Sequence, residues 1–392
     1  MSLSVLPLSY CTNVHPGTTV SAVEEGLKQF TVPAQKKYGA PLAAGLWLAA
    51  PVIRELSSSA EGTVRLAAQL HEMGLPCYTL NAFPYGDFHD ARVKENVYIP
   101  DWTRSERLDY TVACAKVLAS LLSEETEGSI STVPLGFKSL VAVQQLEPLR
   151  FIDRCIPWLI ELSRRLRDLE DTTGKRVRLA IEPEPLCILE TTDEALSFFR
   201  RLWLAAAECG EEENVRRYLG LCYDVCHQAV EFEDVATSIR AIDDAGLRIN
   251  KLHISCAIHL DNPRDAEARR ELLRYVEPRY LHQTLARTSD DRVLRELDLS
   301  PEFVESPPPE FLSAEAWRVH FHVPVNAESL GPLRTTRPEL KQALAAVAKL
   351  SYAPHLEVET YTWRVMPGAT VDLADVLAKE LSATQQLLSP LA

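Results

Sequence analysis

Short apolar runs alternate with longer amphipathic segments along almost the whole chain. Nine runs are strand candidates: LPLSYCTNVH, LAAGLWLAA, PCYTLNAFPYG, SISTVPLG, RVRLAIEPEP, YLGLCYDVCH, NKLHISCAIH, RVHFHVPV and HLEVETYTW. In the segments between most of them, apolar residues recur every three or four positions, which is the helical period. Repeated strand–helix units of this kind predict parallel strands joined by crossover helices.

Two architectures fit such a repeat, a doubly wound open sheet and a closed (β/α)8 barrel. No glycine-rich phosphate loop follows any strand candidate, and that loop is the main signal for a nucleotide-binding open sheet. Polar or functional side chains instead stand in or just after nearly every strand candidate: Asn13, His15, Trp47, Asn81, Glu182, Asp224, His253, His322 and Glu359. A barrel builds its active site from one strand end after another. We therefore predict a TIM barrel, with residues 1–392 forming a single domain.

One strand candidate is too many for an eight-stranded barrel, and RVHFHVPV is the odd one. It follows residues 257–316, a segment that is charged, partly helical and proline-rich around SPPPEF. We interpret 257–316 as an insertion after the seventh strand that forms a lid over the barrel mouth. The HFHVPV run would then return the chain to the site.

The composition favours a protein that works on small molecules. The chain has 392 residues and a net charge of −14, which disfavours nucleic acid as a partner because phosphate backbones are repelled. Its nine cysteines include no C-x-x-C pair, which indicates reduced thiols rather than a disulfide scaffold. We find neither a signal peptide nor an apolar run long enough to enter a membrane, so we expect a cytoplasmic protein.

Glu182 ends the apolar strand in LAIEPEP. A carboxylate buried at a barrel rim is costly unless it is paired or binds a cation. The alternative is a rim residue that caps a loop amide or pairs with Arg178. Glu184 would share the face of Glu182 if the strand continued, but the two flanking prolines argue against this.

Later strand ends add imidazole and carboxylate groups. Asp224 and His227 stand three residues apart in YDVCH, and His253 lies within the apolar KLHIS. Taken singly, such a histidine is more often a hydrogen-bonded core residue than a ligand. Alternation along a strand places His320 and His322 on one face, and it does the same for Glu357, Glu359 and Tyr361.

The order of these groups is more informative than any one of them. Carboxylates and imidazoles on successive strand ends form the ligand set of a catalytic divalent ion such as Zn²⁺, Mn²⁺ or Mg²⁺. The candidate ligands are Glu182, Asp224, His253 and Glu359, followed by His320, His322 and Glu357. The alternative to a metal site is that Cys226 acts as a catalytic nucleophile, but a buried cysteine is more often a packing residue.

This order resembles the xylose-isomerase-like TIM barrel superfamily, which includes sugar isomerases, epimerases and the endonuclease IV group. The resemblance implies metal ligands at Glu182 in IEP, Asp224 in YDVCH, His253 in LHIS, and Glu359 or Glu357 in LEVETY. It implies that His227 contacts the substrate or a second metal. DVCH is also similar to the D-T-C-H of the endonuclease IV group, in which further histidines bind a metal cluster; His320 or His322 would play that part.

More narrowly, YCTNVHPG, YLHQT and LEVETYTW resemble the EboE group of bacterial metabolite traffic proteins. We expect a metal-dependent isomerase or epimerase that acts on a small hydroxylated carbonyl compound, with Glu182 and Glu359 transferring the proton. The expected substrate-binding residues are His227, Asn13, His15, Trp47, Asn81 and His282. Two alternatives stay open, a metal-dependent phosphoesterase of the endonuclease IV type and a non-catalytic metabolite carrier. The oligomeric state stays open, although barrels of this superfamily often pair as homodimers.

Overall fold

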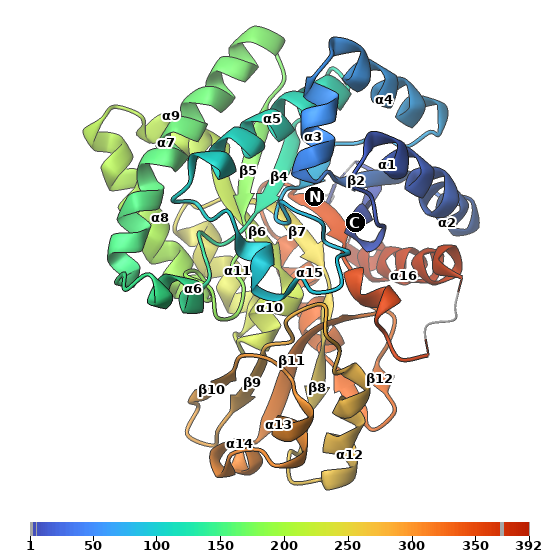
Figure 1. Ribbon diagram of the computed structural model, residues 1–392, viewed down its shortest axis with the longest axis vertical. Helices are drawn as coiled ribbons and strands as arrows, with labels where there is room; N and C mark the ends of the chain where they lie inside the picture. Colours follow the sequence, from blue (N-terminus) through green and yellow to red (C-terminus); the bar gives the residue numbers. More distant parts are fainter. Residues whose placement is uncertain (1–2, 5, 369–371, 392) are drawn as a thin grey trace.

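The computed structural model describes residues 3–4, 6–368 and 372–391. Eight parallel strands close into a barrel in the order β1-β14-β7-β6-β5-β4-β3-β2 (Figure 1). Their bounds are β1 Leu8–Cys11, β2 Leu42–Trp47, β3 Thr79–Asn81, β4 Gly128–Thr132, β5 Val177–Ile181, β6 Leu219–Asp224, β7 Ile249–Ile254 and β14 His355–Val358. The predicted (β/α)8 barrel is confirmed, and RVHFHVPV is the strand candidate that the barrel leaves out.

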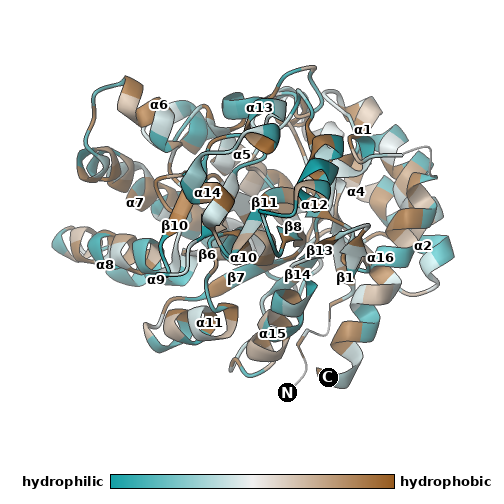
Figure 2. Cartoon of the chain, turned by 90° about the horizontal axis from the view of Figure 1, so that it is seen from below, coloured by the Kyte–Doolittle hydropathy of each residue, from teal (hydrophilic) through white to brown (hydrophobic). Residues whose placement is uncertain are grey.

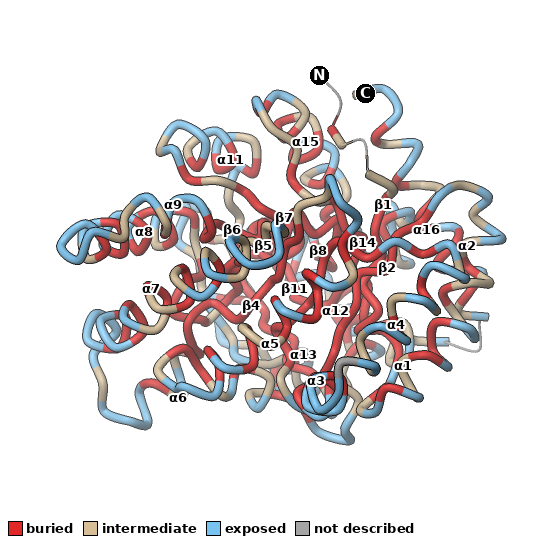
Figure 3. Tube along the Cα trace, turned by 90° about the horizontal axis from the view of Figure 1, so that it is seen from above, coloured by how far each residue is buried: buried red, intermediate tan, exposed pale blue. Residues whose placement is uncertain are grey.

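Helices surround the barrel, with buried inner faces and exposed outer faces (Figure 3). They are α1 Val20–Gly26, α2 Val32–Tyr38, α3 Ala50–Ser57, α4 Ala60–Glu72, α5 Ser105–Leu121, α6 Lys138–Val143, α7 Pro148–Thr173, α8 Thr192–Glu208, α9 Glu212–Tyr218, α10 Val225–Val230, α11 Val235–Asp244, α15 Arg337–Val347 and α16 Leu373–Leu388. Ser59 caps α4, and Thr191 caps α8 together with Glu194. These side chains accept hydrogen bonds from backbone N–H groups that have no partner within the helix. Among the described helices, none is both long and apolar enough to cross a membrane.

The insertion after β7 forms a second sheet, which is antiparallel and has the order β10-β9-β11-β8-β13-β12. Its strands are β8 Cys256–Leu260, β9 Thr284–Arg287, β10 Val293–Glu296, β11 Ala316–Val323, β12 Ser329–Leu330 and β13 Leu333–Thr335. Short helices α12 Ala266–Glu271, α13 Pro301–Glu305 and α14 Pro309–Ser313 complete it, and it forms the lower lobe in Figure 1. The sheet therefore runs to Thr335, past the expected end of the insertion at residue 316. RVHFHVPV has the alternation of a strand, but its partners are β8 and β9 instead of barrel strands.

The insertion lies at the carboxyl end of the barrel because β7 leads almost directly into β8. A small apolar cluster joins α10 to the second sheet, and its fully buried members are Cys226, Val230, Ala257 and Leu285. Arg318 of β11 adds a hydrogen bond of 2.6 Å from Nη1 to the carbonyl oxygen of Ala229. Figure 2 views the molecule from the insertion side and shows the elements of the insertion in front of the barrel strands. This arrangement brings β11 over the ends of the barrel strands.

Candidate metal centre

Asp224 has one carboxylate oxygen that the protein holds and one that it leaves free. It is the last residue of β6 and the N-cap of α10, so Oδ1 accepts the backbone N–H of His227 at 3.1 Å. The hydroxyl of Ser255 donates to the same oxygen at 2.7 Å. Oδ2 is buried and has no hydrogen-bond partner among the described residues. Burial alone would raise the pKa of Asp224, but the neighbouring imidazoles of His227, His322 and His253 hold it well below its usual value.

Glu359 follows the end of β14, and as in Asp224 neighbouring groups hold one of its two carboxylate oxygens by hydrogen bonds. The side-chain amides of Asn13 and Asn81 donate to its Oε1 at 2.8 and 3.0 Å. Its other oxygen, Oε2, lies 3.0 Å from Nδ1 of His253. Although burial favours the neutral acid, His253 lowers the pKa of Glu359. Two asparagines, one just after β1 and one at the end of β3, thus hold one oxygen of this carboxylate while the other faces His253.

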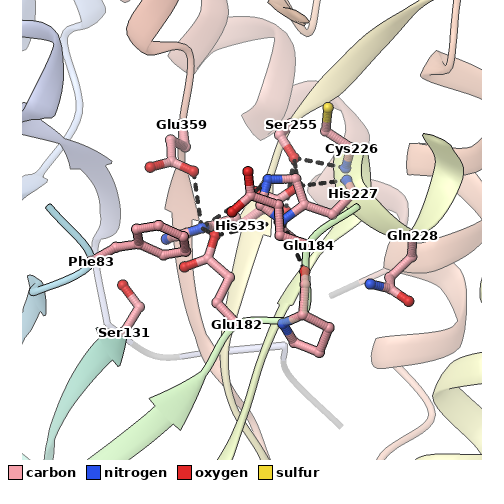
Figure 4. A network of polar contacts seen from close by, with 12 residues as sticks. Phe83, Ser131, Glu182, Glu184, Cys226, His227, Gln228, His253, Ser255 and Glu359 are labelled. Carbon is pink, nitrogen blue, oxygen red and sulfur yellow. Dashed lines mark hydrogen bonds and ion pairs between the residues drawn. The ribbon is translucent and has the colours of Figure 1, made fainter. Parts of the chain in front are cut away.

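Glu182 and His253 complete the cluster (Figure 4). Nδ1 of His253 lies 3.0 Å from Glu182 Oε1 and 3.4 Å from Asp224 Oδ2. Burial opposes a charged imidazole, but the surrounding thiol and carboxylate groups, Cys222, Glu359 and Glu182, raise the pKa of His253 well above its usual value. Three carboxylates therefore converge on one nitrogen of one ring.

This donor set fits a divalent cation. One ligand atom from each of Glu182, Asp224, His253 and Glu359 lies within 4.8 Å of the others, and all four residues are buried. Glu182 Oε2, like Asp224 Oδ2, is buried with no hydrogen-bond partner in the described part of the chain. Such oxygens are costly unless a cation or a donor compensates them. Mixed carboxylate and imidazole ligands suit Zn²⁺ and Mn²⁺.

Glu357 lies on the other side of the same imidazole. Its Oε1 is 3.2 Å from His253 Nε2 and 2.7 Å from the ammonium of Lys251, which is fully buried inside the barrel. Ser9 donates its hydroxyl to Oε2 at 2.9 Å. Burial raises the pKa of Glu357, but Lys251 and His253 lower it to about 2. Glu359 and Glu357 were the two alternative ligands in LEVETY. Glu359 faces the cluster, whereas Glu357 contacts the opposite ring nitrogen of His253.

Three more histidines gather beside the cluster. The ring centroid of His227 is 4.6 Å from that of His320 and 5.6 Å from that of His322. Asp224, His227 and His322 form a second group of close ligand atoms, and Glu184, His227 and His320 form a third. Within the described residues, Nε2 of His320 and Nε2 of His322 are buried without a hydrogen-bond partner. The run HFHVPV, although it belongs to the second sheet, brings both histidines to the site.

A cavity opens above the cluster and encloses about 520 Å³, its open mouth included. Its polar side is formed by Asn13, Asn81, Glu182, Glu184, His227, His320 and Glu359. The rest of the wall comes mainly from the loop between β3 and α5, from Tyr280 and Leu281 of the insertion, and from Tyr361. The insertion therefore supplies part of the cavity wall.

Three expected substrate-binding residues lie elsewhere. His15 and Trp47 border a separate small crevice, and Trp47 donates its indole N–H to the carbonyl oxygen of Pro84 at 3.0 Å. His15 contacts the hydroxyl of Tyr10 and the ring of Phe30. His282 is engaged inside the insertion, where its ring nitrogens lie 3.0 Å from the carbonyl oxygen of His320 and 2.8 Å from Glu277 Oε1. Each of these polar side chains has a hydrogen-bond partner among neighbouring residues, which the sequence does not reveal.

Glu184 is a cavity residue that the sequence analysis set aside because of the prolines around it. The strand β5 ends at Ile181, yet the loop that follows turns Glu184 toward the cavity. Its Oε1 accepts the hydroxyl of Tyr98 at 2.7 Å, and burial raises the pKa of Glu184 well above its usual value. The only signal in the sequence was the second glutamate of IEPEP. Phe83, Tyr98 and Tyr280 had no such signal because they stand outside the barrel strands, in the β3–α5 connection and in the insertion.

Cys226 is a packing residue. It lies in the apolar cluster between α10 and the second sheet, and burial raises the pKa of its thiol well above the usual value. A thiol in that state is a poor nucleophile, because the thiolate is the reactive form. The structure thus favours the packing interpretation over the nucleophile.

No protein-family model matches this sequence, and no curated protein sequence matches it significantly. Solved structures do match. An IolI protein with a bound zinc atom superposes with a TM-score of 0.53 at 12% identity, covering 99% of both chains. A D-psicose 3-epimerase solved in the presence of D-fructose also gives a TM-score of 0.53 at 12% identity, covering 98% of this chain and 99% of that one. A xylose isomerase-like TIM barrel protein from Mycobacterium smegmatis in complex with magnesium matches at 0.49 and 12% identity, covering 100% and 99%. At this identity the likeness concerns the fold alone, which is a (β/α)8 barrel.

Proposed function

We propose that this protein is a divalent-metal-dependent isomerase or epimerase acting on a small compound with a hydroxyl group next to a carbonyl. The observation that carries the proposal is the convergence of ligand atoms from Glu182, Asp224, His253 and Glu359 within 4.8 Å, with Glu182 and Glu359 lining a cavity. A cation held there acts as a Lewis acid toward a carbonyl and its neighbouring hydroxyl. Proteins of the same fold include one with a bound zinc atom and a D-psicose 3-epimerase, which agrees with this reading.

Glu182 and Glu359 are the proton-transfer groups of the proposal. Both line the cavity, and they reach it from different strand ends, after β5 and after β14. Glu182 Oε2 has no hydrogen-bond partner in the described structure, so it is free to take a proton from the carbon next to a carbonyl. Glu359, held by Asn13 and Asn81, takes up a proton from solvent and delivers it to the carbon from its own side, while Glu182 releases its proton to solvent. His227 donates to or accepts from a substrate hydroxyl.

Proton exchange with solvent tests this proposal. The metal-loaded protein is incubated in D2O with a set of α-hydroxyketones, and deuterium next to the carbonyl is followed by NMR. We expect exchange in the wild type and a loss of at least about 100-fold in Glu182→Gln, since general base catalysis contributes on that order. Glu25→Gln, an exposed carboxylate on α1, is the matched control and should exchange normally. Bound metal with no exchange in any substrate would favour the non-catalytic carrier suggested by the resemblance to the EboE group.

A second candidate is a metal-dependent phosphoesterase, and the extra histidines favour it. Asp224, His227 and His322 lie close enough to share a second ion, and two-metal sites are common in phosphate ester hydrolysis. This function requires at least two metal ions per chain and turnover of bis(4-nitrophenyl) phosphate. His322→Ala should then remove one metal equivalent and the hydrolysis together. A single metal per chain and no hydrolysis would exclude it.

A further inference from the structure

The lining of the cavity has a polar part and an apolar part. The polar part, which we call the floor, carries carboxylates, imidazoles and amides, among them Glu182, Glu184, Glu359, His227, Asn13 and Asn81. The rest, which we call the wall, consists mainly of rings and aliphatic side chains, among them Phe83, Phe88, Val97, Tyr280, Leu281 and Tyr361. A part of a ligand that extends beyond the floor therefore meets mostly apolar partners.

Tyr98 and Tyr280, two of the three tyrosines that line the cavity, offer few polar contacts because their hydroxyls are already used. Tyr98 donates to Glu184 Oε1 at 2.7 Å, and Tyr280 donates to the carbonyl oxygen of Phe88 at 3.1 Å. What both residues offer a ligand is mainly ring surface. Phe88 packs against the rings of Tyr280 and Tyr361 at centroid distances of 4.8 and 5.3 Å, which makes this wall a continuous aromatic surface.

The cavity also lacks a cation for an anionic tail. Lys94 is the only lysine or arginine among the described residues that line it. Its ammonium is 2.6 Å from Asp298 Oδ2 and also donates to the carbonyl oxygens of Tyr280 and Glu277, at 2.5 and 3.2 Å. All three of its donors are therefore occupied. A phosphate or carboxylate that extends beyond the floor would therefore lose its water without gaining a free cationic partner.

We propose that the substrate joins a hydroxycarbonyl head to an uncharged apolar tail, such as an aromatic or alicyclic ring, and that free sugars and sugar phosphates are poor substrates. A hydroxyl buried against the aromatic wall would lose its water without gaining a partner, and each such loss is costly. A ring instead gains burial of apolar surface. This inference rests on the proposed function, because the head is assigned to the floor where the metal ligands converge.

The test compares three hydroxamates, which share one chelating head and differ in the tail. Benzohydroxamate has a phenyl ring, gluconohydroxamate has a polyol chain, and phosphoglycolohydroxamate has a phosphate. Dissociation constants are measured by calorimetry on zinc-loaded protein whose metal content is determined in the same sample. We expect benzohydroxamate to bind at least about tenfold more tightly than either of the others, as burial of a ring predicts.

The outcomes separate this inference from the proposed function. Equal binding, or tighter binding of the polyol or the phosphate, would overturn the apolar tail and leave the metal site intact. No binding of any hydroxamate to protein that holds zinc would overturn the proposed function and this inference with it. Val97→Asn adds a polar group to the wall and should reduce the preference for the phenyl tail severalfold. Val143→Asn, at an exposed position on α6, is the control and should leave it unchanged.

Discussion

Glu357 Oε1 lies 3.2 Å from His253 Nε2, while Nδ1 of the same ring faces three carboxylates. An acceptor at Nε2 fixes the proton there and leaves the lone pair of Nδ1 for a metal. Glu357→Gln should therefore lower metal affinity by about 10- to 100-fold, the usual effect of changing such a partner. A competition titration with a chelating dye measures this affinity.

The same variant leaves the ammonium of Lys251 buried without its carboxylate, which should cost about 3–5 kcal/mol of stability. The double variant Lys251→Met, Glu357→Gln separates the two effects. It should recover most of the free energy of unfolding but not the metal affinity. Recovery of both would show that Glu357 acts only through stability.

Gly45 makes room for Glu357 in the barrel. A Cβ atom at this position would lie 1.5 Å from Glu357 Oε2 and 2.5 Å from its Cδ, which forces the carboxylate to move. Gly45→Ala should lower the free energy of unfolding by about 1–3 kcal/mol, as overpacking does, and weaken metal binding as well. Gly86→Ala, where the added atom meets nothing within 4 Å, is the control for urea unfolding. Equal stability of the two variants would contradict the packing described for Glu357.

Lys94 joins the loop after β3 to the insertion through hydrogen bonds and an ion pair. Besides the bonds of its ammonium, its backbone N–H donates to the carbonyl oxygen of Arg279 at 2.8 Å. Lys94→Met removes the side-chain bonds, so amide exchange of residues 277–281 should accelerate at least about tenfold. Metal content should stay the same, because Lys94 is not a ligand. Unchanged exchange at 277–281 would contradict a connection between the loop and the insertion through this side chain. Lys28→Met, at an exposed position, serves as the control.

Replacing Glu170, near the C-terminal end of α7, should change how the free energy of unfolding depends on pH in acid. Burial alone would raise its pKa, but hydrogen bonds from Arg176, Arg217 and Tyr218 lower it to about 2 from a usual 4.5. A lowered pKa stabilises the folded state above about 4.5, and this contribution is lost as the pH falls toward 2. The free energy of unfolding of Glu170→Gln should therefore fall less steeply over this range than that of the wild type. Identical slopes would contradict the assignment.

The barrel and the convergence of the four candidate ligands were predictable because both follow from strand periodicity. Glu182, Asp224, His253 and Glu359 stand in or directly after parallel strands, and parallel strands bring their carboxyl ends to one rim. The sequence states the order of these residues, and closure of the barrel then brings their side chains together. No knowledge of the loops is needed for that step.

The rest of the site depends on contacts that periodicity does not encode. Alternation identifies β11 as a strand, but it does not say that β8 and β9 are its partners. Tyr98 reaches the cavity from the connection between β3 and α5, and Tyr280 reaches it from the insertion. Trp47 and His282 bear the polar groups of binding residues, yet they satisfy those groups on neighbouring backbone and side chains.

Metal content is the most direct test of the central claim that the four strand-end residues bind a divalent cation. The protein is purified without chelators and analysed by inductively coupled plasma mass spectrometry, beside Asp224→Asn and Glu182→Gln. We predict at least one equivalent of a divalent transition metal or magnesium in the wild type and a loss of that metal in both variants. The same metal content in all three proteins, or no metal in any preparation, would contradict the account.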